Sequence, residues 1–209
     1  MKESVHIRAN EVKWDKWAES IDSESWKYEF LRRSQRGVVS LLDLKPGMSL
    51  LDIGCGTGWA LGYAAQMVNG DATFYGVDLS TKMIEKAKEN FKEHPNFHFI
   101  TSNSESIPLD DSLFNYIICT NSFHHYLHPD KAVNEMKRLL KPGGKTYILD
   151  PTADTRIVKF ANRIIKLIER AHVNLYSTKE FEQMITNAGL NYAGSKTIER
   201  QERVHIGKK

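Results

Sequence analysis

Five short apolar runs alternate with helical patterns over most of the chain, and this alternation restricts the fold more than any other feature. The runs MSLLDIG, ATFYGVD, NFHFIT, FNYIICT and KTYILD, beginning at positions 48, 72, 96, 114 and 145, are almost continuously apolar. Strands of this kind are buried on both faces, as in a parallel sheet covered by helices. The sequence therefore predicts a doubly wound α/β fold.

Two segments between these runs have the apolar period and the end signals of helices. Residues 81–91 place four apolar side chains on one face and follow Ser80, a candidate N-cap. Residues 129–144 begin at a proline and end at Pro-Gly-Gly, with Leu140 in the predicted buried stripe. Both segments are expected to cover the sheet.

The C-terminal part of the chain has a different pattern. A capping box, Ser177 with Glu180, opens a helix that is expected to stop at Gly189. Residues 190–198 and 203–208 then read as two adjacent strands joined by a short turn. The complete prediction is a mostly parallel seven-stranded sheet with an antiparallel C-terminal edge strand.

Length and composition fit one soluble domain. The 209 residues predict a single domain with an N-terminal helical cap over 1–44 and a core over 45–209. A chain that is 41% hydrophobic and 26% charged is not a disordered one. The net charge of +3 is small and its basic residues are interspersed with acids, so we expect no nucleic-acid partner. The oligomeric state is left open.

Targeting signals are lacking in this sequence. Its first twenty residues contain no apolar segment of the signal-peptide type. No run approaches the roughly 18 apolar residues of a membrane span, so no integral membrane segment is expected. Two well-separated cysteines fit a reducing compartment better than a disulfide framework. A cytoplasmic protein is the expectation.

The segment LLDIGCGTGWAL, residues 50–61, carries three glycines at alternate positions after an acid. A glycine turn between a strand and a helix can bring backbone N–H groups against a ligand, although a tight connection alone would also use glycines. Asp78 ends the next strand about 20 residues later, where a carboxylate can bind both hydroxyls of a ribose. Together these features predict a ligand that contains a nucleoside.

The spacing of the glycines distinguishes two classes of nucleoside ligand. A dinucleotide fingerprint, G-x-G-x-x-G, requires a third glycine where Trp59 stands. Asp52 followed by G-x-G-x-G instead resembles the first motif of class I S-adenosylmethionine-dependent methyltransferases. The resemblance covers about residues 45–209 and is greatest to small enzymes that act on quinone precursors, sterols and other metabolites. It implies a Rossmann-like methyltransferase fold.

The resemblance also implies S-adenosylmethionine as cofactor, S-adenosylhomocysteine as product and a small-molecule substrate. The cofactor-binding residues that it implies are Asp52, Gly54, Cys55, Gly56, Gly58, Asp78, Leu79, Met83, Asn103, Ser104, Thr120 and Asn121. Two positions depart from the family pattern. Asn103 stands where an aspartate commonly binds the adenine amino group, and Asn115 replaces an aspartate of the fourth strand, where we expect a structural role.

The histidines that follow the fourth strand are the candidate catalytic residues. His124 or His125 could face the substrate as a general base, or both could orient the loop. A metal site that adds His128 is disfavoured because no acid or thiolate completes the set, and no metal is expected. Cys55 and Cys119 are read as small residues at crowded strand ends in preference to nucleophiles.

The substrate contacts are predicted from aromatic residues. Trp17 and Tyr28 could cover the active site, and Tyr126 could line it, since aromatic faces suit a cationic sulfonium. Packing of the N-terminal helices is the alternative. The methyl acceptor, whether oxygen, carbon, nitrogen, sulfur or arsenic, is left open, because a fold does not select a chemistry.

Residues 155–172 are read as a helical insertion with a basic stripe opposite an apolar one. The basic stripe contains Arg156, Lys159, Arg163, Lys166 and Arg170, and the apolar one contains Ile157, Phe160, Ile164 and Ile168. The favoured interpretation is a solvated basic face on a helix whose apolar side joins the core or a dimer. The alternatives are a lid over an apolar substrate, and attraction to an anionic substrate or membrane surface.

Two other functions are kept as alternatives to methyl transfer. A methyltransferase-like protein could bind the cofactor without catalysis. An NAD(P)-dependent oxidoreductase is less favoured, because Trp59 occupies the position of the third glycine and no hydride-transfer set is identifiable.

Overall fold

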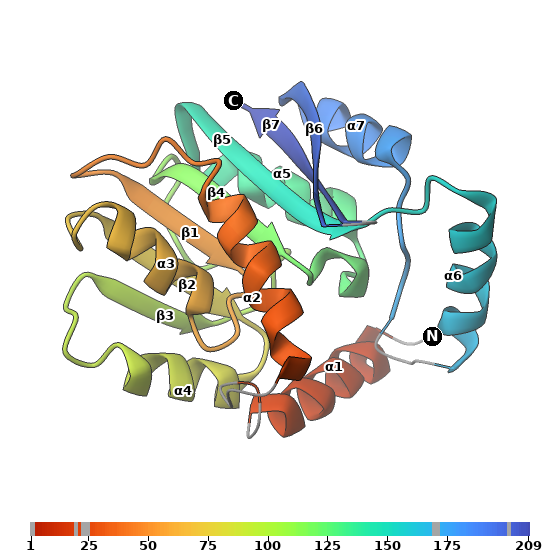
Figure 1. Ribbon diagram of the computed structural model, residues 1–209, viewed down its shortest axis with the longest axis horizontal. Helices are drawn as coiled ribbons and strands as arrows, with labels where there is room; N and C mark the ends of the chain where they lie inside the picture. The colour runs from red at the N-terminus through yellow and green to blue at the C-terminus, as the bar shows by residue number, and fades with distance from the viewer. Residues whose placement is uncertain (1–2, 19–20, 22–25, 169–171, 200–201) are drawn as a thin grey trace.

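The computed structural model describes residues 3–18, 21, 26–168, 172–199 and 202–209 (Figure 1). Within them, a seven-stranded sheet has the order β3-β2-β1-β4-β5-β7-β6. The strands are β1 (Ser49–Ile53), β2 (Thr73–Asp78), β3 (Phe97–Thr101), β4 (Phe114–Thr120), β5 (Leu140–Pro151), β6 (Asn191–Glu199) and β7 (Glu202–Lys208).

The pairing of the strands confirms the predicted fold class. Strands β1 to β5 pair in parallel, whereas β7 is antiparallel to β5 and to β6. The C-terminal hairpin thus forms one edge of the sheet, with β7 inside and β6 outermost. The strand order reverses between β1 and β4, and in such sheets the ligand crevice opens at the carboxyl ends of those strands.

Helices cover both faces of the sheet (Figure 1). Residues of β1 alternate between two cores: Leu50 joins the core with α2 and α3, whereas Leu51 and Ile53 join the core with α5 and α7. The covering helices are α2 (Trp26–Val39), α3 (Trp59–Met67) and α4 (Thr81–Asn90) on one face, and α5 (Pro129–Leu139) and α7 (Thr178–Asn187) on the other.

Two further helices lie outside these layers (Figure 1). Helix α1 (Glu3–Ala18) crosses the end at which the parallel strands finish, and α6 (Arg156–Ile168) stands at the side of the molecule. Contacts at both ends hold α1 there: His6 Nε2 lies 2.8 Å from the His125 carbonyl oxygen, and the Ser80 hydroxyl donates to Asp15 at 2.6 Å. Helix α1 therefore covers the ligand-binding edge of the sheet.

The predicted capping signals are confirmed. The Ser80 hydroxyl accepts the Met83 N–H at 3.2 Å and caps α4. Ser177 and Glu180 form both bonds of the capping box at the start of α7. The predicted structural role of Asn115 is also confirmed, because its side-chain oxygen accepts the Ser49 N–H and the Lys141 ammonium, each at 3.0 Å.

The predicted end of the helix over residues 129–144 is wrong. Helix α5 ends at Leu139, and the Leu-Lys-Pro-Gly-Gly segment belongs to β5. Pro142 disfavours helical backbone at the residue before it, so the chain leaves the helix early. Gly143, at φ +78°, then donates to the Lys209 carbonyl at 3.0 Å, which pairs this segment with the C-terminus. Leu140 stays fully buried, but as a strand residue.

None of the helices in the described ranges is long and apolar enough to cross a membrane.

Candidate active site and cofactor pocket

A cavity of about 400 Å³ opens at the carboxyl ends of β1, β2 and β4. Its floor contains Ile53, the turn that follows β1, and Asp78 at the end of β2. Its roof comes from α1 and α2, through Trp14, Trp17 and Tyr28. The pocket thus lies where the strand order reverses, and the N-terminal helices line the side opposite the strand ends.

The three positions of the turn after β1 require glycine for different structural reasons. A Cβ on Gly54 would collide with the Ser122 side chain, and one on Gly58 would lie 2.7 Å from the Phe91 ring. Only Gly56 faces open space, since its nearest neighbour would be the Met83 sulfur at 3.9 Å. All three have positive φ, which favours glycine. The cradle for a ligand is therefore made at Gly56, whereas Gly54 and Gly58 allow the protein to pack on itself.

Asp78 connects β2 to the glycine turn. Its two carboxylate oxygens accept the N–H groups of Gly56 and Ser80, each at 2.9 Å. Burial raises the pKa of Asp78, and these two N–H donors oppose that rise. A carboxylate has about four acceptor positions, so Asp78 can also accept a hydroxyl donor in the cavity that it lines.

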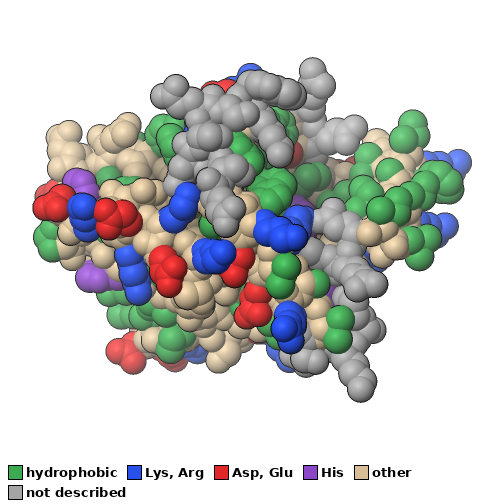
Figure 2. Space-filling model, turned by 90° about the horizontal axis from the view of Figure 1, so that it is seen from below, with side chains coloured by type: hydrophobic (Ala, Val, Ile, Leu, Met, Phe, Trp, Pro, Cys, Tyr) green, Lys and Arg blue, Asp and Glu red, His purple; other side chains and the backbone are tan. Residues whose placement is uncertain are grey.

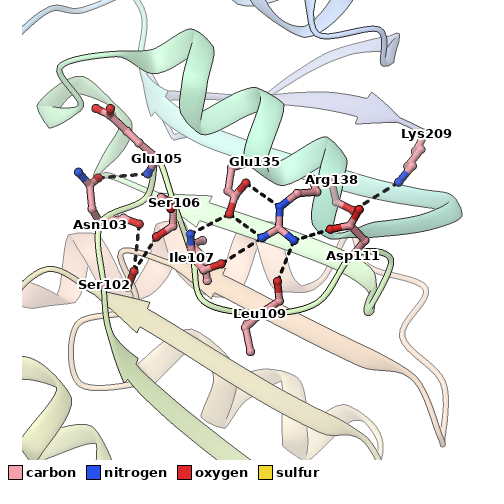
Figure 3. Close-up of polar contacts among 10 residues, drawn as sticks. All are labelled: Ser102, Asn103, Glu105, Ser106, Ile107, Leu109, Asp111, Glu135, Arg138 and Lys209. Atoms are coloured by element: carbon pink, nitrogen blue, oxygen red, sulfur yellow. Dashed lines mark hydrogen bonds and ion pairs between the residues drawn. The ribbon is translucent and has the colours of Figure 1, made fainter.

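The loop after β3 carries the adenine-side residues predicted from the sequence, and α5 holds it in place (Figure 3). The Asn103 side-chain oxygen accepts the Glu105 N–H at 3.1 Å, so it already has one donor before any ligand binds. Farther along the loop, the Ile107 N–H donates to Glu135 at 2.7 Å, and Arg138 donates to the Leu109 carbonyl at 2.7 Å. Asn103 and Ser104 both line the cavity.

Buried polar atoms without a partner mark the centre of the site. The Thr120 hydroxyl lines the cavity, is buried and has no hydrogen-bond partner within the described residues. Neighbouring Asn121 also lines it, with φ at +54°. A buried hydroxyl without a partner destabilises the folded protein, and a polar ligand can supply the hydrogen bond. The donor and acceptor set therefore fits a nucleoside with a polar tail.

Asp52 and Gly58, two residues of the predicted cofactor set, do not line the cavity. Asp52 is fully buried beneath the turn, and neither of its carboxylate oxygens has a hydrogen-bond partner in the described structure. Burial, with the nearby Asp78 charge, raises the pKa of Asp52 to about 8. Phe91 covers Gly58. The other ten members of the predicted set line the cavity.

His124 is paired with a buried acid. It follows β4 in a short 3-10 helix, η1 (Phe123–His125), and its Nδ1 lies 2.7 Å from Asp150 of β5. The side chain of His124 is 17% exposed and lines the cavity, whereas that of Asp150 is only 1% exposed and lies behind it. When Nδ1 donates to the carboxylate, Nε2 is the basic ring atom.

His125 has a different environment from its neighbour. It is buried, its carbonyl lies against His6, and the Trp14 ring packs on its imidazole at 5.1 Å between centroids. The aromatic chain continues from Trp14 to Trp17 and on to Tyr28, at 5.3 and 5.8 Å. His125 therefore also orients the roof, and His124 is the better placed base.

Tyr126 lines the cavity, but its hydroxyl contacts other side chains of the protein. That oxygen lies 3.1 Å from the Ser122 hydroxyl and 3.5 Å from Cys119 Sγ, beneath the Gly54 turn. Burial raises the pKa of Tyr126 well above its usual value of 10. Tyr126 therefore lines the cavity as predicted while its hydroxyl braces the turn, and its contact with substrate stays a prediction.

Neither cysteine has the environment of a nucleophile. Burial raises the pKa of Cys119 to about 12 and that of Cys55 well above its usual value of 9. A thiolate is the reactive form, so both side chains stay as thiols. Across the described residues, no group of three or more His, Cys, Asp or Glu is placed to hold a metal ion.

Comparison with known proteins agrees with this geometry. Residues 51–148 match the methyltransferase domain family. The matched segment runs from the centre of β1 into β5 and therefore includes the glycine turn, Asp78 and the His124 loop. The matched segment has the fold and the motifs of a class I methyltransferase domain. The glycine turn and Asp78 are thus parts that the chain shares with this methyltransferase domain family.

Individual methyltransferases are similar over most of the chain. A demethylmenaquinone methyltransferase of Bacillus mycoides is 28% identical over 75% of this chain and 68% of its own length. An uncharacterized methyltransferase of Bacillus subtilis is 32% identical over 68% of this chain and 57% of its own length. Among these and similar curated relatives, the chain spans between 41% and 68% of the relative's length.

Solved methyltransferase structures share the fold. The crystal structure of YcgJ from Bacillus subtilis superimposes with a TM-score of 0.70 at 27% identity, over 78% of this chain and 70% of the other. A SAM-dependent methyltransferase from Aquifex aeolicus superimposes with a TM-score of 0.73 at 22% identity, over 93% and 97% of the two chains.

Two acids of this methyltransferase site are missing from the sequence prediction. Asp150 ends an apolar run, as Asp78 does, so its position at the end of a predicted strand could have identified it. Glu202 gives no such signal, because only the pairing of Pro151 with Glu202 between β5 and β7 brings it to the cavity. Glu202 is 3% exposed and accepts the Ser34 hydroxyl at 2.5 Å. Burial raises its pKa to about 7.

Proposed function

We propose that this protein transfers a methyl group from S-adenosylmethionine to a small apolar acceptor. The observation that carries the proposal is the position of Asp78, which lines the cavity and is fixed by the N–H of Gly56 at 2.9 Å. In this arrangement Asp78 would bind the ribose hydroxyls, and the loop that contains Asn103 and Ser104 would bind the adenine edge. Thr120 would bind the polar tail.

The side chains of this site would mainly bind and orient. The cofactor supplies an electrophilic methyl group on a positively charged sulfur. Holding two reactants in line can supply about 7–11 kcal/mol of such a barrier, so few catalytic groups are required. The roof formed by Trp14, Trp17 and Tyr28 would exclude water from the reacting atoms. His124, held by Asp150, would accept the proton that the acceptor loses.

The walls of the cavity support an aromatic or otherwise apolar acceptor. Side chains from α1 and α2 give this part of the pocket an apolar and aromatic surface: Ile7, Trp14, Trp17, Tyr28, Phe30 and Leu31. The relative from Bacillus mycoides is named for demethylmenaquinone, a quinone of this chemical type. We therefore propose a quinone-like acceptor.

We also propose that the protein works in the cytoplasm, because a reducing compartment fits its two buried free thiols.

Calorimetric titration tests the cofactor first. Wild-type protein is titrated with S-adenosylmethionine, S-adenosylhomocysteine and NADH, next to Asp78→Ala and the matched surface variant Asp71→Ala. Micromolar binding of both adenosyl ligands, lost only in Asp78→Ala, is expected, with no heat from NADH. Folded wild-type protein that binds neither adenosyl ligand would overturn the proposal. A water-soluble naphthoquinol with methyl-labelled cofactor then tests the acceptor.

A further inference from the structure

Helix α6 exposes its apolar side chains instead of burying them. Ile157 is 82% exposed and Leu167 is 87% exposed. Three more apolar side chains on this helix are exposed as well: Phe160, Ile164 and Ile168. They recur at three- and four-residue steps, so they form one face of the helix, called here the apolar face. The expectation was that this side joins the core or a dimer, and its first part, the core, is wrong.

A polar side chain anchors the helix to the protein. The Asn162 amide nitrogen donates to the Asn174 side chain at 2.9 Å, and its oxygen accepts the Leu175 N–H at 3.1 Å. The same oxygen lies 2.8 Å from His172 Nε2. Asn162 is 7% exposed. Because this amide fixes the opposite side of α6, the apolar face is held pointing outward.

A row of cations runs directly beside the apolar face, so the expectation that the two stripes lie opposite each other is wrong. The row consists of Arg156, Lys159, Arg163 and Lys166, all exposed. Each of them precedes an exposed apolar residue by one position, and one helical step of about 100° places the two sectors next to each other. Helix α6 contains no acid. No ion pair involving these four cations is present in the described part of the structure.

Figure 2 shows the result on the molecular surface. Hydrophobic side chains gather on the lobe formed by α6, and basic side chains lie at its outer border. Figure 1 shows the helix standing at the side of the sheet, so its length is accessible. A helix with one apolar and one basic sector, both exposed, has the form of helices that lie in a lipid headgroup layer.

The dimensions and charge of this face argue against a second copy of the chain as its occupant. A helix of 13 residues is about 20 Å long, and the apolar face is about 10 Å wide, or about 200 Å². Stable protein interfaces bury about 800 Å² per partner. Two such helices packed together would also bring two rows of cations into one contact. An anionic surface complements the row instead.

We propose that α6 docks the protein on an anionic lipid surface, with its apolar face among the upper acyl chains and its basic row on the headgroups. Helix α6 is connected to the candidate site by one short segment, in which the Val173 N–H donates to the His124 carbonyl at 2.9 Å. Docking would therefore bring that side of the pocket to the lipid. The proposal goes beyond methyl transfer and does not depend on it.

Vesicle sedimentation tests the proposal with the full chain and no cofactor. Wild-type protein is mixed with vesicles of phosphatidylcholine and phosphatidylglycerol in equal parts, or of phosphatidylcholine alone. Binding at least about tenfold tighter to the mixed vesicles is expected. Because salt screens exposed charges, this binding should weaken as sodium chloride rises from about 0.05 to about 0.5 M. The double variant Ile157→Ser/Leu167→Ser should lose at least tenfold in binding.

Matched variants separate the two components of the surface. Arg163→Gln/Lys166→Gln should remove the preference for phosphatidylglycerol, whereas Met67→Ser, an exposed apolar residue on α3, should change nothing. Circular dichroism and light scattering of each variant report fold and mass. Equal binding of wild type to both vesicle types, no binding at all, or a dimer that Leu167→Ser dissociates would overturn the proposal.

Discussion

The carboxylate of Asp78 accepts the backbone N–H of Gly56 at 2.9 Å, across the ends of two neighbouring strands. The bond explains why the acid and the glycine occur about 20 residues apart in one motif. Asp78 positions the turn, and the turn leaves a side-chain-free surface at Gly56 for the ligand. Loss of either residue should therefore reduce cofactor affinity, but through different physical causes.

Substitution of Gly56 should mainly reduce cofactor affinity, whereas substitution of Gly58 should mainly reduce stability. Alanine at Gly56 or Gly58 would cost about 1–2 kcal/mol of stability for its positive φ. Gly58→Ala would cost about 1–3 kcal/mol more, because its Cβ would overlap the Phe91 ring. Gly56→Ala should instead lose cofactor affinity. Denaturant unfolding and calorimetry on both variants check this, and equal stability losses would contradict the assignment.

The His124–Asp150 pair should act on turnover and not on cofactor binding. Asp150→Asn keeps the volume of the side chain but removes the charge that orients the imidazole at 2.7 Å. A positioned base contributes about 10²- to 10⁴-fold, so turnover should fall within that range while cofactor affinity stays within about threefold. The pH profile should also move. Asp71→Asn, an exposed control, should leave both constants unchanged. An unchanged pH profile would argue for a structural pair only.

The fold was predictable because its signals are local. Continuous apolar runs indicate buried strands, and Ser80 and Ser177 mark two helix starts through hydrogen bonds only three residues long. The end of α5 has a local signal in Pro142, but the strand that follows it does not. That strand depends on the pairing of Gly143 and Gly144 with Lys209, a contact between distant parts of the chain.

The site was predictable where it follows a strand end. Asp78, Thr120 and His124 each lie at or just beyond the end of an apolar run, and parallel strands bring those ends together. Glu202 reaches the cavity through antiparallel pairing, and its register cannot be read from local sequence. The outward apolar face of α6 was also missed, because a helical period does not tell which sector is anchored.

Arg138 should be required for the order of the adenine-side loop (Figure 3). Its guanidinium bonds Glu135, the Ile107 and Leu109 carbonyls, and Asp111. Lysine cannot reproduce this planar set of donors, so Arg138→Lys should lose about 1–3 kcal/mol of stability. It should also weaken cofactor binding through the loop. Arg36→Lys, in an exposed pair with Glu29, should lose less than about 1 kcal/mol.

The partner of Arg138 adds a pH dependence to this loop. Burial alone would raise the pKa of Glu135, but the bonds from Arg138 and the Ile107 N–H lower it below the usual 4.5. The folded state thus favours the charged carboxylate, so its stabilisation is present above pH 4.5 and is lost as the pH falls through the lower folded value. Arg138→Lys should flatten this acid limb in denaturant unfolding. An acid limb identical to that of wild type would contradict the role of the network.

Glu202 should give stability the opposite pH dependence. Its pKa in the folded protein is about 7, whereas an unfolded glutamate has about 4.5. The folded state therefore binds the proton more tightly, and the stability that this provides is present below pH 4.5 and declines as the pH rises through about 7. Glu202→Gln should leave stability at pH 4 nearly unchanged and raise it by about 3 kcal/mol at pH 8, relative to wild type.

Asp52, with a pKa of about 8, gives the stability a pH dependence of the same sign. The difference in unfolding free energy between wild type and Glu202→Gln removes this contribution, because both proteins contain Asp52. Glu182→Gln, on the exposed face of α7, should change stability by less than about 0.5 kcal/mol at either pH. A Glu202→Gln protein less stable than wild type at pH 8 would mean that the carboxylate is charged in the folded state. Ser34 would then stabilise an anion in the wall of the cavity, because its hydroxyl donates to that carboxylate at 2.5 Å.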